Sequence, residues 1–319
     1  MSTAEPSDKI ALTGGSRRDR MRRMGDQVFS GLALGSGVLI LVALSGVALF
    51  LLIQGWPALT ADPSQIPGGD GFVNYVAPLA FGTILSSAIA VLVGIPMAIA
   101  VSLFIVFYAP KRIAQTLGAF VDLLAAIPSI VYGLWGVAVL GPAMVGLQGW
   151  LEGHLGFLPF FKGPVTTTGR TMFTAGLVLG VMILPIVSAV TREVFSQTPR
   201  KLIEGALALG ATRWEMIRMT VLPFGRSAIV GASMLGLGRA LGETMAVALI
   251  LSISGDVTFN LISAGNPSTI AANIALKFPE SSGLAVDVLI ASGLALFAIT
   301  LVVNMAARSV IARAERGAR

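Results

Sequence analysis

Six long apolar stretches constrain this chain more than any other feature of its 319 residues. A helix that crosses about 30 Å of hydrocarbon needs on the order of 20 mostly apolar residues, and each stretch is long enough. Backbone groups in lipid must be hydrogen-bonded within the protein, so helices are expected and the fold class is an all-α membrane protein. The predicted spans are Val28–Ile53, Val76–Tyr108, Leu117–Leu140, Thr171–Val190, Phe224–Leu251 and Leu284–Ala307.

The composition agrees with a protein that lies in the lipid bilayer. The chain is 55% hydrophobic and 12% charged, whereas an ordinary soluble domain is roughly 25% charged. Its mean hydropathy is +0.85. A soluble globule of this composition would have too little polar surface to cover itself. The sequence also contains no cysteine, which excludes disulfides, thiolate catalysis and cysteine-based metal sites.

The basic residues gather on one side of the predicted spans. Eighteen of the 22 Lys and Arg residues lie on this side: they precede the first span, follow the last, lie in the connections after the second and fourth, or, for Arg226, lie just inside the start of the fifth. Such connections face the cytoplasm, so both termini are expected to be cytoplasmic. The same distribution accounts for the basic isoelectric point, and no nucleic-acid partner is expected. The predicted parts are a cytoplasmic polar tail expected to be disordered (1–27), a first transmembrane anchor (28–53), a transmembrane core (76–307) with a cytoplasmic loop (191–223), and a basic cytoplasmic tail (308–319).

The loop between the fourth and fifth spans has the pattern of two short helices joined by a bend. Thr198 followed by Pro199 is typical of a helix start, and Gly210 is typical of a helix end. Thr212 with Glu215 three residues later predicts a capping box that opens the second helix. An alternative is that this loop only packs against its own helix bundle.

The spacing within this loop resembles the EAA loop of type I ABC importer permeases. That motif reads E-A-A, three residues, G, nine residues, I, one residue, L-P. The spacing is kept here, with glycine in the second position and threonine in place of isoleucine. The resemblance implies the type I ABC importer permease fold, with this loop docking as coupling helices into a groove of an ATPase subunit. The motif positions are Glu204, Gly205, Ala206, Gly210, Thr220, Leu222 and Pro223.

Two further stretches narrow the resemblance to the permeases of the high-affinity phosphate importer. They are IPSIVYGLWG (127–136) and GRALGETMAV (238–247). That importer has two different permease subunits, and the residues 245–247 favour one of them over its sibling, which tends to carry a GETAP-like form. The resemblance implies phosphate import with a sibling permease, two ABC ATPase subunits and an extracytoplasmic phosphate-binding protein. ATP and magnesium would then bind to the ATPases, with no cofactor on this chain.

Arg239 and Glu243 are the only charged residues between Ser227 and Ser254. Arg239 lies 16 residues beyond Pro223, about 24 Å along a helix, which places it near mid-membrane. Each charge there is unfavourable by roughly 2.5–3.5 kcal/mol on insertion scales. A spacing of four predicts that the two side chains share a helix face and pair. Arg239 would then offer its guanidinium to a phosphate oxyanion while Glu243 holds it in the empty site, or the pair would only brace the bundle.

No catalytic constellation is visible in the sequence, and the chain is expected not to be an enzyme. The single histidine, His154, lies in a predicted outer loop, and no lysine follows a glycine as a phosphate-binding loop requires. Asp122 is expected to contact a helix N-terminus or nearby basic residues. Three alternatives stay open: a permease for another oxyanion or small solute, a secondary transporter or channel that uses Arg239 and Glu243, and an intramembrane enzyme whose base or nucleophile cluster is not apparent.

Overall fold

The computed structural model describes residues 17–252 and 257–316, and these form helices and connections with no strand. The all-α prediction is confirmed, and six helical segments of the described chain are long and apolar enough to cross a membrane, as predicted. Residues 1–16 and 317–319 of the two predicted tails lie outside the described residues. The six segments are Gln27–Thr60, Phe72–Tyr108, Ser129–Leu155, Met172–Ser196, Arg213–Leu241 and Leu284–Ser309.

The chain divides into two compact units, residues 1–50 and residues 51–319. The described part of the first unit is a stretch of α1 (Arg17–Thr60). Because this helix begins at Arg17, the expectation of disorder over 1–27 is wrong for residues 17–27. Arginine and methionine are good helix formers, and they make up all but one of the residues from 17 to 24.

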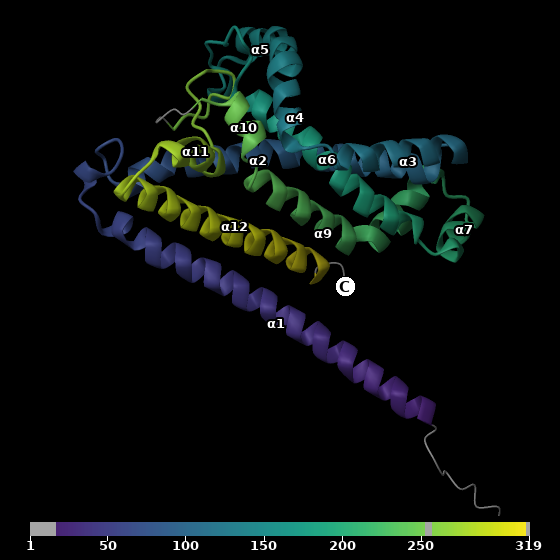
Figure 1. Ribbon diagram of the computed structural model, residues 1–319. Helices are drawn as coiled ribbons and strands as arrows, with labels where there is room; N and C mark the ends of the chain where they lie inside the picture. Colours follow the sequence, from purple (N-terminus) through teal and green to yellow (C-terminus); the bar gives the residue numbers. More distant parts are fainter. Residues whose placement is uncertain (1–16, 253–256, 317–319) are drawn as a thin grey trace, which may run out of the picture. The chain divides into compact units, whose positions relative to one another are not determined.

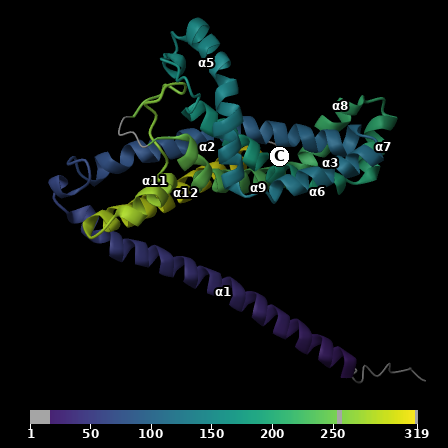
Figure 2. The same ribbon diagram turned by 45° about the horizontal axis from the view of Figure 1, so that its top comes forward.

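Four long helices of the second unit pack together (Figures 1 and 2). The helix α2 (Phe72–Leu103) pairs with α6 (Met172–Ser196), and α9 (Leu222–Leu241) packs against both. The helix α12 (Leu284–Arg316) contacts α2 and α9. The remaining elements are η1 (Pro63–Gln65), η2 (Phe104–Tyr108), α3 (Lys111–Ala125), α4 (Ser129–Trp135), η3 (Gly136–Leu140), α5 (Gly141–Leu155), η4 (Pro159–Phe161), α7 (Arg200–Ala208), α8 (Arg213–Met216), η5 (Ile217–Val221), α10 (Met245–Ile250), α11 (Ile270–Lys277) and η6 (Phe278–Glu280).

Small and hydroxyl-bearing residues hold α2 against α6. A Cβ atom on Gly94 would lie 2.7 Å from the carbonyl oxygen of Gly180, so only glycine allows this approach. Further along, the Ser102 hydroxyl lies 3.0 Å from that of Ser188 and 2.6 Å from that of Thr191. In lipid the hydrophobic effect between helices is absent. Helices there associate through van der Waals packing, which close backbone approach improves, and through hydrogen bonds such as those between hydroxyl groups.

The third span lies further along the chain than predicted. The prediction of one helix over Leu117–Leu140 is wrong, because α3 ends at Ala125 and a new helical segment begins after Pro128. Proline disfavours helical backbone in the residue before it, which separates the two helices. That segment continues to Leu155, through residues predicted to be loop.

The displaced helix α3 lies along α6 in Figures 1 and 2. Arg192 on α6 donates from Nη2 to both carboxylate oxygens of Asp122 on α3, at 2.8 and 2.9 Å. The expected contact of Asp122 with a basic residue is confirmed, and its role is to hold α3 against α6.

Candidate functional site

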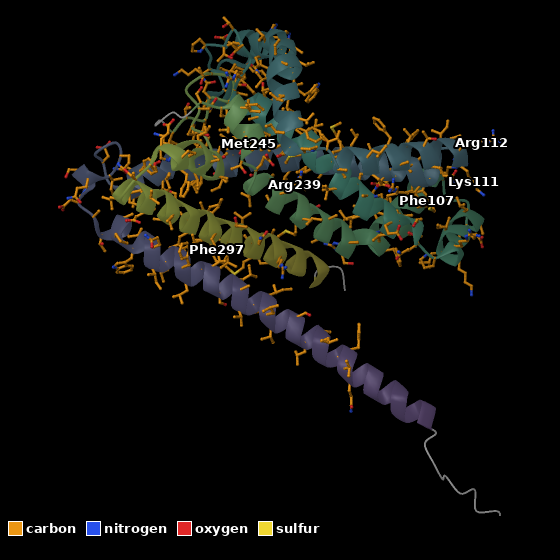
Figure 3. The ribbon with its side chains drawn as sticks, in the orientation of Figure 1. Phe107, Lys111, Arg112, Arg239, Met245 and Phe297 are labelled. Carbon is orange, nitrogen blue, oxygen red and sulfur yellow. The ribbon has the colours of Figure 1, made fainter. Side chains whose placement is uncertain are left out.

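The fifth predicted span is broken where its two charges lie. The helix α9 ends before Gly242, and α10 follows after a non-helical link over 242–244. Figure 3 shows Arg239 at the end of α9. The prediction of one helix over Phe224–Leu251 is therefore wrong at this link. Two features favour a break here. Glycine, present as Gly242, is unfavourable inside a helix by roughly 1 kcal/mol relative to alanine. The carboxylate of Glu243 in the link can also accept a hydrogen bond from the backbone of the next helix.

Arg239 and Glu243 do not pair, although their spacing predicted that they would. No ion pair within 4.0 Å joins these two described residues. Glu243 is 7% exposed, and its Oε1 accepts from the backbone N–H of Ala246 at 3.1 Å in the first turn of α10. Arg239 lies in the last turn of α9. A carboxylate at a helix N-terminus and a cation at a helix C-terminus are both favoured by the helix dipole, so each charge is stabilised by a helix end.

The guanidinium of Arg239 has no hydrogen-bond partner among the described residues. It carries five N–H donors, and none is hydrogen-bonded to an atom of the described chain. Its Nε is also shielded from solvent. An unsatisfied buried donor is unfavourable by roughly 1–3 kcal/mol, more when charged, so the site favours a ligand that accepts hydrogen bonds. An oxyanion is the ligand that matches a guanidinium in both charge and geometry.

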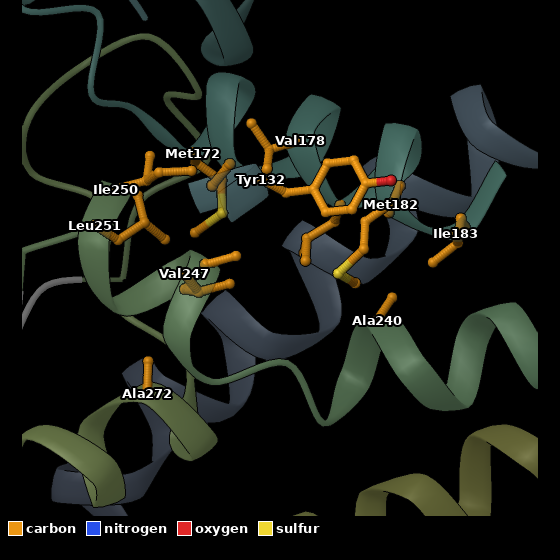
Figure 4. Close-up of a cluster of buried hydrophobic side chains, with 14 of the residues drawn as sticks. Tyr132, Met172, Val178, Met182, Ile183, Ala240, Val247, Ile250, Leu251 and Ala272 are labelled. Atoms are coloured by element: carbon orange, nitrogen blue, oxygen red, sulfur yellow. The ribbon is translucent and has the colours of Figure 1, made fainter. Parts of the chain in front are cut away.

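Tyr132 belongs to the surroundings of Arg239 and was missed in the sequence. It lies on α4 in a buried cluster that includes Ala240, the neighbour of Arg239 in the chain (Figure 4). Its hydroxyl donates to the carbonyl oxygen of Leu124 at 2.8 Å, and the charge of Arg239 acts on it electrostatically. The signal in the sequence was a single tyrosine in a predicted span whose only other ionisable residue is Asp122, a feature shared with many packing residues.

The loop over 191–223 contains the two predicted short helices, α7 and α8. Gly210 ends α7 as predicted, with φ of +84°. The backbone N–H of Ala211 donates to the carbonyl of Ala206 at 3.2 Å, which completes a Schellman motif. The capping box is also confirmed, because Thr212 Oγ1 accepts from the Glu215 N–H at 3.3 Å and Glu215 Oε2 accepts from the Thr212 N–H at 2.7 Å.

The predicted start of α7 is wrong in detail. Pro199 is the N-cap residue instead of the first helical residue, and the Thr198 Oγ1 is buried without a partner. Thr198 is instead tied to the end of α6, because its N–H donates to the carbonyl of Phe195 at 3.3 Å.

The EAA-like residues divide between a buried and an exposed face of this loop. Ala206 is 8% exposed and packs in a cluster with Ile217 and Val221 of η5. Glu204 and Gly205 are exposed on the other face of α7. Three further positions lie where the loop continues into the fifth span: the Thr220 hydroxyl donates to the carbonyl of Met216 at 2.6 Å, and Leu222 and Pro223 open α9.

The second short helix reaches from this loop toward α2. Trp214 of α8 lines an apolar hollow of about 660 Å³ together with Pro96, Leu103 and Phe104. Leu202 of α7 is half-exposed, and Leu209, the C-cap residue that follows this helix, is 91% exposed. The loop thus presents apolar side chains outward while its other face is anchored to the bundle.

Among the described residues, no group of three or more His, Asp or Glu side chains could hold a metal ion. The single histidine, His154, is exposed and stacks on Trp150 with ring centroids 4.6 Å apart. Its Nδ1 lies 2.9 Å from the carbonyl oxygen of the same tryptophan.

The sequence and the fold both match known transport proteins. The family described as "Binding-protein-dependent transport system inner membrane component" matches residues 90–319. The chain is 46% identical over 318 residues to "Phosphate transport system permease protein PstC 2" of Mycobacterium tuberculosis, covering 96% of this chain and 97% of that protein. It is 37% identical to the protein PstC of Xylella fastidiosa, covering 99% of this chain and 98% of that one.

Two solved structures of an alginate importer share the fold. One, of a bacterial ABC transporter involved in the import of the acidic polysaccharide alginate, aligns with a TM-score of 0.56 at 20% identity, over 93% of this chain and 99% of that chain. The other, in complex with an alginate pentasaccharide-bound periplasmic protein, aligns with a TM-score of 0.59 at 19% identity, over 89% and 93%.

Proposed function

Since this chain belongs to the family of inner-membrane components of binding-protein-dependent transport systems, we propose that it forms one half of the membrane path of an ATP-driven phosphate importer. It is a permease subunit of an ABC phosphate importer, and the near-full-length identity to PstC proteins supports phosphate as its cargo. The other half of the path is a PstA-like sibling permease. Two ABC ATPase subunits bind ATP and magnesium, and an extracytoplasmic phosphate-binding protein delivers the cargo. This chain binds no cofactor and catalyses no reaction.

The proposed orientation places both termini and the loop over 191–223, here called the coupling loop, in the cytoplasm of a bacterial cell. Lys111 and Arg112 lie at the same end of the second unit as α7 (Figures 1 and 3). This end therefore gathers the basic turn after α2 and the basic loop after α6. The positive-inside rule assigns such an end to the cytoplasm.

The loop over 191–223 is the proposed contact with an ATPase subunit. Its exposed leucines and Glu204 present a mixed apolar and charged surface for docking. Helical structure continues from Arg213 to Leu241. From Trp214 to Arg239 this is about 38 Å along one element at about 1.5 Å per residue. ATP binding would close the ATPases, move this element and open the path outward, and hydrolysis would reset it inward.

Arg239 is the proposed phosphate ligand in the path, and its unused guanidinium donors are the observation that carries this role. Glu243 lies in the link beside it and partly offsets the positive charge, which keeps phosphate from binding too tightly to leave. Because Glu243 is engaged by α10, Arg239 has no ion pair to break before it binds an anion.

Replacing Arg239 by Gln tests the assignment. Phosphate uptake should be lost, because the amide offers fewer donors and no charge, while the complex with the ATPase still assembles. Arg226→Gln is the matched control, since Arg226 lies near the other end of the same helix and its variant should keep uptake. Normal uptake by the Arg239→Gln variant would show that this residue only braces the bundle.

A second measurement distinguishes an ATP-driven importer from a secondary transporter or channel. Uptake in proteoliposomes should require the ATPase subunits and ATP. Uptake that persists without them would contradict the import mechanism even if Arg239 proved essential.

A further inference from the structure

A polar pocket lies at the end of α6 opposite to the coupling loop. Its volume is about 400 Å³, and a water molecule's share of liquid volume is about 30 Å³, so a hydrated ion fits. Its walls come from the segment that precedes α6 and from the chain that follows α10. The described lining includes four hydroxyl side chains and one guanidinium, and no carboxylate: Thr166, Thr167, Thr168, Ser252 and Arg170.

Arg170 connects this pocket to the proposed phosphate path. Its Nε donates to the carbonyl of Ile250 at 3.3 Å, and its Nη2 donates to that of Leu249 at 2.5 Å. These bonds cap the C-terminus of α10, whose N-terminus is capped by Glu243. Six residues of helix rise about 9 Å, so the pocket and the Arg239 link lie at the two ends of one short helix.

The electrostatics of the pocket favour an anion. Two of the five guanidinium donors of Arg170 are used by α10, so the others remain for a ligand. The 25-residue helix α6 begins two residues after Arg170 and directs its positive dipole end toward this region. Its first backbone N–H groups are already bonded within the protein, so it contributes field and no donors.

The hydroxyl groups supply the remaining features of an oxyanion site. Each threonine and serine hydroxyl donates one hydrogen bond and can rotate to suit a ligand. The Oγ1 of Thr166 is buried with no hydrogen-bond partner in the described protein. A pocket that offers several neutral donors and one guanidinium matches a tetrahedral oxyanion, which has acceptors on every side.

We propose that this pocket is an outer subsite for phosphate, from which the anion passes along α10 to Arg239. The inference rests on the proposed phosphate import and deepens it, because it names a second binding place on this chain. The same chemistry would suit the phosphate of a lipid headgroup, so the test must separate the free ion from a lipid.

The lack of cysteine in the sequence gives a direct test. Thr167→Cys places a single thiol on the pocket wall, and Thr60→Cys places one on an exposed threonine outside the pocket as the matched control. The purified transport complex, in detergent without added lipid, is treated with a thiol reagent, and labelling of this subunit is followed with increasing inorganic phosphate. At ten times the dissociation constant, labelling of the pocket thiol should slow about tenfold, while that of the control should not change.

Further substitutions in the pocket test whether the protection depends on its guanidinium and hydroxyl groups. Adding Arg170→Gln or Thr168→Val to the Thr167→Cys chain should weaken the protection, and Arg170→Lys should retain part of it because it keeps the charge. Equal protection of both thiols, or protection only by an added anionic phospholipid, would overturn the proposal. Unchanged labelling at Thr167→Cys together with loss of uptake in Arg239→Gln would refute this subsite and leave the proposed function standing.

Discussion

The two glycines of the coupling loop respond to the same substitution in opposite directions. Gly210 has φ of +84°, and no atom lies within 4 Å of a Cβ placed on it. Alanine there would therefore meet no clash, only the backbone strain of the left-handed region, about 1–2 kcal/mol. Gly205 lies inside α7 and also faces open space. Alanine there should stabilise the helix by about 0.8–1.0 kcal/mol.

Amide hydrogen exchange of α7 in the purified transport complex measures both effects. A loss of 1–2 kcal/mol changes an opening equilibrium by a factor of roughly 5–30, so Gly210→Ala should speed exchange of α7 by about that much. Gly205→Ala should slow it by a factor of about 4–5, since 1.4 kcal/mol corresponds to tenfold. The amides of α6 from Met172 to Val190 serve as an internal reference, because this largely buried part of the helix lies outside the loop over 191–223.

The consequence for transport follows from the same geometry. A frayed α7 loses the Schellman bonds that fix it before α8, so Gly210→Ala should also weaken co-purification of the ATPase. Exchange of α7 within twofold of the parent in Gly210→Ala would refute the backbone reasoning. A shift of both variants in the same direction would show that docking, and not helix stability, controls the measurement.

Two other predictions concern packing and capping. Gly94→Ala forces a Cβ to within 2.7 Å of a backbone oxygen on α6 and should lower stability in detergent by roughly 1–3 kcal/mol, whereas Gly180→Ala meets its nearest atom at 3.4 Å and should lower it much less. Equal melting temperatures of the two variants would contradict this close approach. Thr212→Ala removes the N-cap acceptor of α8 and should destabilise the loop by about 0.5–2 kcal/mol, which would appear as reduced phosphate-stimulated ATPase activity of the complex. Activity equal to that of the parent would show that the cap does not limit coupling.

The sequence predicted the features that depend on residues close together in the chain. The six apolar spans follow from local hydropathy, which is a strong signal because lipid tolerates few alternatives. The glycine stop at Gly210 and the capping box at Thr212 and Glu215 each involve residues three to five positions apart. Such bonds can form as soon as the local helix forms, whatever surrounds it.

The failures lie where local patterns compete with one another or with distant contacts. Thr198 has the right residue type for an N-cap, but its backbone N–H is hydrogen-bonded to the carbonyl of Phe195 at the end of α6. Arg239 and Glu243 have the right spacing for a pair, but the glycine between them ends the helix that would have aligned them. Arg170 reaches carbonyl groups 79 and 80 residues away, and no short-range pattern signals such a contact.

The break at 242–244 separates two parts of the fifth span that are anchored differently. On one side, α9 continues into the coupling loop, so it should follow movements of the ATPases. On the other side, α10 packs so closely on α4 that a Cβ on Gly133 would lie 2.7 Å from the Cα of Ala246, and its C-terminus is held by Arg170. Movement of α9 relative to α10 would therefore change the distance between Arg239 and Glu243. In a continuous helix that distance would be fixed. The extent to which Glu243 offsets the positive charge of Arg239 could then not vary with the state of the ATPases.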